Sequence, residues 1–212
     1  MTPREQVAFV YRELARLGLN VASTGNVSVR TQDGMIITPS GANAETVSTE
    51  GLVAMTLEGV AEAGANPSSE WHMHAAIYRA DRRAGAIVHT HSDACTALAT
   101  LNEKLPAFHY MIAAFGGEDV RCAPYVTFGT PELAEHAVAA IAGRSACLLA
   151  NHGMIVHAAN PPAALRQAVL LEALARQYLL ARAAGTPRIL TREEMRAARE
   201  RFRTYGGRGR RR

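Results

Sequence analysis

Cysteine is scarce in this sequence, and long apolar runs are missing. The three cysteines, Cys95, Cys122 and Cys147, are widely spaced and form no C-x-x-C pair. This spacing predicts no disulfide framework and favours a reducing compartment. No apolar run approaches the roughly 18 residues that span a bilayer, and the first residues lack the apolar core of a secretion signal. We therefore expect a cytoplasmic protein that has no membrane partner.

Positive charge is concentrated at one end. The formal net charge is +4, and the last five residues contain four arginines, so that the rest of the chain is neutral. A nucleic-acid-binding domain usually carries a broad basic face instead. We expect no nucleic-acid partner, and we interpret residues 207–212 as a basic, disordered tail. A binding module that uses this tail would show salt-sensitive binding that depends on it.

The composition is that of an ordinary globular protein. The 212 residues are 48% apolar and 20% charged, which suits one domain with a sizeable core. No repeat, linker or composition shift marks a boundary, so residues 1–206 are predicted to form a single domain. Helical and strand patterns alternate irregularly and include hairpins. The predicted fold class is α/β, with a mainly antiparallel central sheet covered by helices.

The elements follow from local signals. Thr2, Pro3 and Glu5 form a capping box that opens the first helix. The turn at 32–34 predicts a hairpin, and Glu58-Gly59 predicts a second strand pair. Further elements are expected as follows: a helix from Ser68 or Ser69 to about Arg82, a strand at 86–91, helices at 92–101 and 130–143, strands at 147–150 and 154–156, a long helix at 161–184, and a last helix after Thr191.

The motif His89-Thr90-His91 is a candidate metal site. Alternate residues of a strand point to the same face, so the two imidazoles can share an ion. A catalytic zinc site with an open position needs a third ligand, and His152, just after an apolar strand, is the best candidate. His157 is a weaker choice, because an edge-of-core histidine explains it better.

The segment Ser68-Ser69-Glu70 opens a predicted helix. Serine hydroxyls and free amides at a helix start can bind phosphate, although plain capping explains them too. Glu70 falls in the predicted first turn, where it could ligate zinc or carry a proton. His72 and His74 lie on opposite helix faces and should not share a metal. His74 shares the face of Glu70, and it either supports that site or is structural.

Two short glycine-containing segments are further candidates for phosphate contacts. Gly25 and Asn26 precede a predicted strand, and Ser40 and Gly41 follow one. Each pair offers a close backbone approach and a side-chain donor, as ordinary turns also do.

Together these motifs resemble the class II aldolase/adducin family, and within it the enzymes that act on L-fuculose 1-phosphate. The resemblance covers nearly the whole chain, and no single motif is specific by itself. It is carried by these segments: 25–30, 33–35 and 37–41, 68–71, His89-Thr90-His91, 109–114, 123–125 and 127–130, His152-Gly153, and Thr204-Tyr205-Gly206. Ser40 stands where these enzymes have Thr, and the arginine-rich end after Tyr205 is unlike theirs.

The resemblance implies a role for each matching residue. His89, His91 and His152 would bind one Zn²⁺ per subunit, and Glu70 would ligate the metal in the free enzyme and act as acid/base. Tyr110, from a neighbouring subunit, and Tyr205 would transfer protons. A homotetramer with sites between subunits is implied. The phosphate would contact Gly25, Asn26, Ser40, Gly41, Ser68 and Ser69, and Phe128 would line the aldehyde end.

The implied activity is zinc-dependent cleavage of a small ketose 1-phosphate into dihydroxyacetone phosphate and an aldehyde such as L-lactaldehyde. Three alternatives share the fold. A pentulose-phosphate epimerase would have Asp at the position of Glu70. A methylthioribulose-1-phosphate dehydratase keeps a Glu and would release water. A noncatalytic, adducin-like scaffold would not be expected to keep all three histidines.

Overall fold

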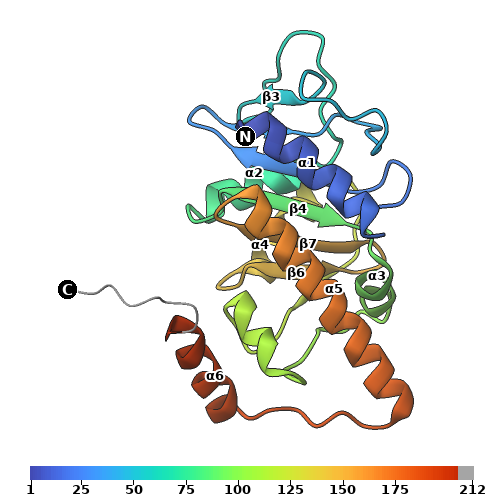
Figure 1. Ribbon diagram of the computed structural model, residues 1–212, viewed down its shortest axis with the longest axis vertical. Helices are drawn as coiled ribbons and strands as arrows, with labels where there is room; N and C mark the ends of the chain where they lie inside the picture. Colours follow the sequence, from blue (N-terminus) through green and yellow to red (C-terminus); the bar gives the residue numbers. More distant parts are fainter. Residues whose placement is uncertain (205–212) are drawn as a thin grey trace, which may run out of the picture.

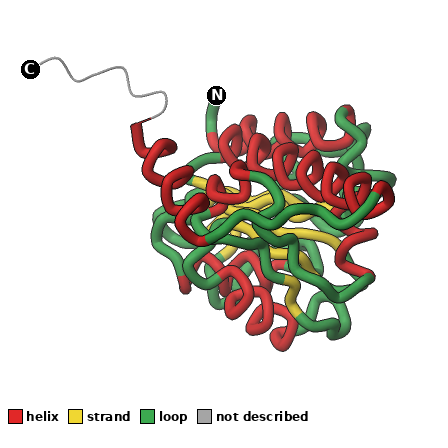
Figure 2. The backbone as a smooth tube through the Cα atoms, turned by 90° about the horizontal axis from the view of Figure 1, so that it is seen from below, coloured by secondary structure: helices red, strands yellow, loops and turns green. Residues whose placement is uncertain are grey.

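The computed structural model describes residues 1–204, which form one sheet between two helical layers (Figures 1 and 2). The seven strands lie in the order β3-β2-β1-β4-β7-β6-β5. All neighbouring strands are antiparallel except β5 and β6. The predicted α/β class with a mainly antiparallel sheet is therefore confirmed. The strands are β1 (Asn26–Arg30), β2 (Met35–Ile37), β3 (Val53–Met55), β4 (Ala86–Thr90), β5 (Cys122–Ala123), β6 (Ala146–Leu149) and β7 (Gly153–Ala158).

The helices cover both faces of the sheet. They are α1 (Pro3–Arg16), α2 (Trp71–Ala80), α3 (Asp93–Thr100), the 3-10 helix η1 (Tyr110–Phe115), α4 (Pro131–Ile141), α5 (Pro161–Ala184) and α6 (Arg192–Thr204). One apolar cluster joins α1, α3 and α5 to one sheet face, and a second joins α2 and α4 to the other. Along β4, Val88 belongs to the first cluster and Ile87 to the second. Since side chains alternate along a strand, His89 shares the α2 face with Ile87.

Most predicted elements are confirmed. The capping box of α1 is present, with Thr2 and Glu5 in both reciprocal bonds. The hairpin forms from β1 and β2, and α5 has the predicted bounds. Thr191 and Glu194 form the second predicted capping box, at the start of α6.

Several details of the prediction were wrong. The strand pair expected around Glu58-Gly59 does not form. A single antiparallel bridge between Met55 and Ala61 spans this turn instead. Helix α2 begins at Trp71, and Glu70 is its N-cap rather than part of the first turn. The sequence pattern also missed η1 and the two-residue strand β5, because neither is long enough to show a period. The expected boundary between residues 1–206 and the tail 207–212 lies outside the described residues.

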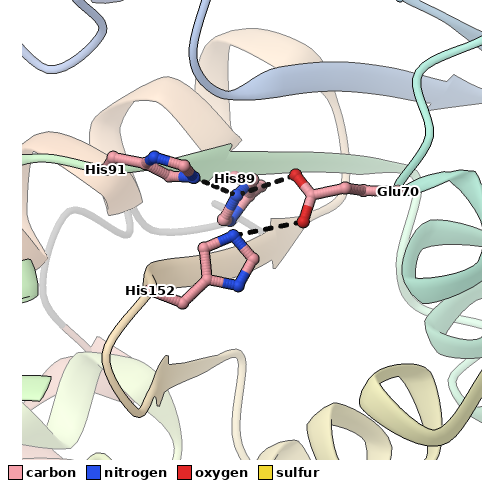
Figure 3. Close-up of side chains that lie close together, drawn as sticks. All are labelled: Glu70, His89, His91 and His152. Atoms are coloured by element: carbon pink, nitrogen blue, oxygen red, sulfur yellow. Dashed lines mark hydrogen bonds and ion pairs between the residues drawn. The ribbon is translucent and has the colours of Figure 1, made fainter. Parts of the chain in front are cut away.

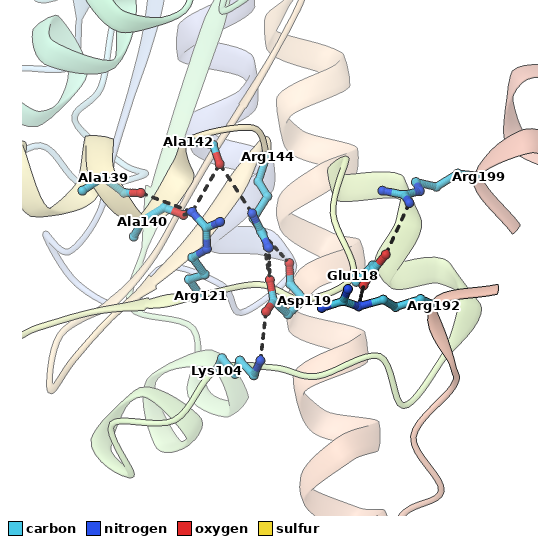
Figure 4. Close-up of polar contacts among 10 residues, drawn as sticks. All are labelled: Lys104, Glu118, Asp119, Arg121, Ala139, Ala140, Ala142, Arg144, Arg192 and Arg199. Carbon is cyan, nitrogen blue, oxygen red and sulfur yellow. Dashed lines mark hydrogen bonds and ion pairs between the residues drawn. The ribbon is translucent and has the colours of Figure 1, made fainter. Parts of the chain in front are cut away.

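Helix α6 lies against the loop that follows η1 (Figures 1 and 4). Glu118 forms ion pairs with Arg192 and Arg199 of this helix. The neighbouring Asp119 is held from the other side by Lys104 and Arg144. These contacts bring the end of the described chain close to η1. Within residues 1–204, no helix combines the length and apolar character needed to cross a bilayer.

Gly153 allows β7 to begin close to the end of β4. A Cβ atom at this position would lie 2.3 Å from the Thr90 carbonyl oxygen and 3.2 Å from the His91 ring. Main-chain atoms in a paired strand cannot move aside easily, so a side chain here would separate β4 from β7.

We therefore expect Gly153→Ala to lower the free energy of unfolding by about 1–3 kcal/mol, the usual range for overpacking a core. Gly185→Ala is the control, because no heavy atom lies within 4 Å of a Cβ added there and its φ of 162° is extended backbone. Urea denaturation measures both variants. Equal losses in the two would contradict the role given to Gly153.

Candidate metal centre

Three imidazoles and one carboxylate converge on the α2 side of the sheet (Figure 3). His89 Nε2 lies 3.1 Å from His91 Nε2 and 3.0 Å from Glu70 Oε2. His152 Nε2 lies 3.2 Å from Glu70 Oε1. One ligand atom from each of the four residues lies within 4.8 Å of all the others. The structure thus brings together the four residues that the sequence nominated as metal ligands.

Sheet pairing explains how residues distant in sequence meet here. His89 is in β4, and His91 follows the end of that strand, so both rings project to one face. Strand β7 pairs antiparallel with β4, and Thr90 lies opposite Met154. The turn between β6 and β7 therefore places His152 beside the end of β4. Glu70 enters from the N-terminus of α2 on the same face.

The hydrogen bonds of His89 fix its orientation. Its Nδ1 lies 2.8 Å from the Met154 carbonyl oxygen, which only accepts, so Nδ1 carries the proton. The lone pair of Nε2 in a neutral ring then faces His91 and the Glu70 carboxylate. Lone pairs that face one another in a buried site repel, so the arrangement requires a cation, either a proton or a metal ion.

Electrostatics point in the same direction. Burial alone would raise the pKa of Glu70, but its contacts with His89 and His152 outweigh burial and hold that pKa well below its usual range. Burial would lower the pKa of His89, and the Glu70 carboxylate raises it overall. Burial, together with His89 and His152, lowers the pKa of His91 to about 4. Neutral His91 and ionised Glu70 are the forms that bind metals.

The donor set fits a zinc ion. Structural surveys place zinc about 2.0–2.2 Å from imidazole nitrogen and carboxylate oxygen, so two ligands of a tetrahedral ion lie roughly 3.3 Å apart. Three of the separations, 3.0, 3.1 and 3.2 Å, are close to that spacing, and all four ligand atoms lie within 4.8 Å of one another. Among residues 1–204, buried Glu70 Oε1 has the ion pair with His152 but no hydrogen bond of good geometry. A bound ion would satisfy this oxygen, and Glu70 and the three histidines could together hold it.

A cavity of about 360 Å³ opens beside the cluster. Two large side chains at its mouth, Tyr125 and Phe128, are 62% and 65% exposed. Phe128 was nominated from the resemblance, whereas the sequence reasoning gave no role to Tyr125 or Asn151. The lining residues are Ser69, Glu70, His91, Tyr125, Val126, Phe128, Asn151 and His152.

Two of the nominated phosphate segments lie side by side. The amide of Ser40 donates to the Asn66 carbonyl at 2.9 Å, and that of Ser68 donates to the Thr38 carbonyl at 3.1 Å. Ser68 Oγ in turn accepts from the amide of Glu70, two residues on, in the turn that precedes α2. Gly41 follows with a φ of 71°. The segment carrying Ser40 and Gly41 thus lies against the one carrying Ser68 and Ser69.

The third segment is tied to Glu70. Gly25 has a φ of 72°, and a Cβ there would lie 2.7 Å from the His89 carbonyl oxygen. The side chain of Asn26 turns inward, where it contacts His74 through Oδ1 and Glu70 through Nδ2. The sequence reasoning did not anticipate this contact, because it depends on the pairing of β1 with β4.

The other nominated residues lie elsewhere. Tyr110 is 53% exposed and contacts Phe202 of α6, away from the cavity beside the histidines. Tyr205 lies outside the described residues. His157 is buried against the Arg144 carbonyl oxygen, away from the four candidate ligands, as the sequence suggested. His72 stacks on Trp71 and is not among the four candidate ligands.

An antiparallel sheet with this buried group of histidines and a carboxylate defines a metal-dependent enzyme of the class II aldolase type. Residues 5–179 match the family model described as the class II aldolase and adducin N-terminal domain. The chain belongs to the class II aldolase and adducin family, as the motifs suggested.

Named relatives agree with this assignment. The L-fuculose phosphate aldolase of Escherichia coli K12 is 47% identical over 195 residues, which cover 92% of this chain and 91% of that protein. The 5-methylthioribulose-1-phosphate/5-deoxyribulose-1-phosphate aldolase of Rhodospirillum rubrum is 46% identical over the same length, with 92% and 88% covered. A solved L-fuculose 1-phosphate aldolase superposes with a TM-score of 0.91 at 39% identity, covering 95% and 96%. The chain is therefore a metal-dependent aldehyde-lyase.

Removing one candidate ligand tests the metal centre. We expect His91→Ala to lower the zinc content of purified protein from about one ion per chain to well below half an ion per chain. Two histidines and a carboxylate hold zinc more weakly than three histidines and a carboxylate. Elemental analysis after dialysis measures this. His136→Ala is the control, since His136 lies on α4 outside the cluster. Full zinc content in His91→Ala would exclude His91 as a ligand.

Proposed function

We propose that this aldolase cleaves a ketose 1-phosphate similar to L-fuculose 1-phosphate into dihydroxyacetone phosphate and a small aldehyde such as L-lactaldehyde, with zinc as its metal. The observation that carries the proposal is the convergence of His89, His91, His152 and Glu70 beside an open cavity. The activities named for the 46–48% identical relatives supply the substrate class.

Zinc held by the three histidines would supply a Lewis acid that stabilises negative charge on substrate oxygens. Cleavage breaks the C3–C4 bond, and its electron pair stays on the dihydroxyacetone phosphate fragment. That fragment then needs a proton at C3. Glu70 is proposed to deliver it, because its carboxylate lies at the cavity and next to the histidines. Such proton transfer typically contributes about 10²–10⁴-fold to a rate.

The remaining groups are proposed to orient the substrate. Its phosphate would bind at the adjoining segments that carry Ser40, Gly41, Ser68 and Ser69, with the amides of Gly25 and Asn26 nearby. The phosphate is remote from the breaking bond. Binding it fixes the substrate's position and so aligns the C3–C4 bond with the catalytic groups. Phe128, at the cavity mouth, would contact the aldehyde portion.

Two tyrosines are proposed to complete the site. Tyr110 would remove the C4 hydroxyl proton in the site of a neighbouring subunit, and Tyr205 would assist protonation. Tyr110 is exposed and does not line the cavity of its own chain, which favours this arrangement. A cytoplasmic homotetramer with one zinc per subunit is part of the same proposal.

A second substrate has specific support. The relative from R. rubrum is named for 5-methylthioribulose 1-phosphate and 5-deoxyribulose 1-phosphate, and Tyr125, Val126 and Phe128 give the cavity an apolar side. An aldehyde that carries a methyl or methylthio group would suit that side. Fuculose-type and deoxyribulose-type substrates differ at this end only, where pocket shape decides.

A coupled assay for dihydroxyacetone phosphate tests the proposed reaction. With a panel of ketose 1-phosphates, we expect release from L-fuculose 1-phosphate or 5-deoxyribulose 1-phosphate, lost with a chelator and restored by Zn²⁺. Mass spectrometry of the products serves as the second readout. Loss of water from methylthioribulose 1-phosphate would support the dehydratase alternative, and a C4 epimer of the substrate would support the epimerase. Either result without fragment release would contradict the proposal.

The role of Glu70 is tested by Glu70→Gln. The three histidines remain, so at saturating Zn²⁺ the zinc content should still reach about one ion per chain, even though the affinity falls. The value of kcat should fall by about 10²-fold or more, because the amide cannot carry the proton. Glu132→Gln is the matched control, since Glu132 lies in the exposed first turn of α4. A zinc-loaded Glu70→Gln enzyme with wild-type kcat would remove Glu70 from the mechanism.

A further inference from the structure

A chain of buried polar side chains runs from Tyr78, in the last turn of α2, to the Glu70 carboxylate. Tyr78 Oη lies 2.8 Å from Ser28 Oγ, which lies 2.7 Å from His74 Nδ1. On the other side of the ring, His74 Nε2 lies 2.6 Å from Asn26 Oδ1. Asn26 Nδ2 then donates to Glu70 Oε2 at 2.9 Å. We call Tyr78, Ser28, His74 and Asn26 the relay.

The ionised carboxylate sets the direction of every bond in the relay. Glu70 can only accept, so Asn26 presents its amide nitrogen to Glu70 and its oxygen to His74. His74 Nε2 must therefore donate, which leaves Nδ1 unprotonated in the neutral ring. Ser28 donates its hydroxyl hydrogen to Nδ1 and accepts from Tyr78. Each group in the relay has one assignment, and burial favours the neutral form of His74 by lowering its pKa to about 3.

The packing of α2 against the sheet does not require a polar residue at position 74. His74 is completely buried between Met73 and Ala75, which both belong to the apolar cluster on this sheet face. An apolar side chain there would need no hydrogen-bond partners, whereas a buried imidazole must have them. The polar ring is therefore best explained by what it holds in place.

The relay fixes the orientation of the Glu70 carboxylate. Within residues 1–204, the Glu70 carboxylate contacts His89, His152 and Asn26. Two of these are candidate metal ligands themselves, so Asn26 is the partner that holds the carboxylate from behind. Asn26 in turn depends on His74 to anchor its oxygen, because an amide held at one end can rotate.

We propose that His74 is a positioning residue that, through Asn26, fixes the Glu70 carboxylate against the three histidines. The proposal rests on the proposed roles of Glu70 as metal ligand and proton carrier. Both roles of Glu70 depend on its orientation. A carboxylate that turns away from the three histidines binds zinc less well and delivers its proton less often. Partners behind metal ligands typically contribute about 10–100-fold to affinity or activity.

The test compares the zinc dissociation constants of three variants, measured by competition with a chelator. His74→Leu removes the donor to Asn26, and we expect zinc to bind about 10–100-fold more weakly. His74→Gln keeps an N–H where Nε2 stood, and its affinity should recover to within about 3-fold of wild type. The control is His157→Leu, which removes another buried histidine of the same sheet, outside the cluster. Its zinc affinity should not change.

Kinetics provide the second readout. For a ketose 1-phosphate that wild type cleaves, His74→Leu should lower kcat about 10–100-fold. KM should change less than kcat, because the hydrogen bonds of the His74 ring go to Asn26 and Ser28 and not to Ser40, Gly41, Ser68 or Ser69. If wild type binds zinc and cleaves no ketose 1-phosphate, the proposed function fails, and the zinc affinities still decide the role of His74.

Equal zinc affinities in His74→Leu, His157→Leu and wild type would overturn the proposal. So would a His74→Gln variant as weak as His74→Leu. If His74→Leu does not fold, Ser28→Ala replaces it. That change leaves His74 Nδ1 without a donor and should weaken zinc binding about 3- to 10-fold, the usual range for one hydrogen bond. Wild-type affinity in Ser28→Ala would then count against the relay.

Discussion

The burial of the Glu70 carboxylate is the constraint on which the rest of the site depends. Only 7% of this residue is exposed, and an ionised group in such a place is costly unless it is matched by positive charge and hydrogen bonds. His89, His152 and Asn26 provide the match. Each comes from a different part of the chain, so the sheet must assemble correctly before the carboxylate is stable.

The pairing of β4 with its two neighbours performs that assembly. Strand β1 lies on one side of β4 and contributes Asn26, and β7 lies on the other and follows directly after His152. Helix α2 packs on the same face, with Glu70 at its start and His74 one turn later. The site therefore lies at the end of the sheet's central strand, next to the buried core. Only the cavity mouth, with Tyr125 and Phe128, is formed by exposed side chains.

Sequence patterns predicted the parts of this arrangement that are set locally. The capping box at Thr2, the hairpin around residue 33 and the same-face pair His89 and His91 each depend on residues that are close in sequence. Asn26 points inward and contacts His74 because of the order in which the strands pair. Local periodicity in the sequence does not reveal strand order. The start of α2 was placed too early because serine is a favoured N-cap residue. The N-cap is Glu70 instead, and the Ser68 hydroxyl accepts from its amide in the turn before the helix.

The central claim is that Glu70 and three histidines hold one metal ion. Zinc X-ray absorption spectroscopy of the purified, zinc-loaded protein measures the ligands directly. The account predicts a shell of nitrogen and oxygen atoms at about 2.0–2.1 Å, with the outer-ring scattering of imidazoles and no sulfur. Sulfur at about 2.3 Å, from any of the three cysteines, or a shell of oxygen atoms without imidazole scattering, would place the ion elsewhere and contradict the account.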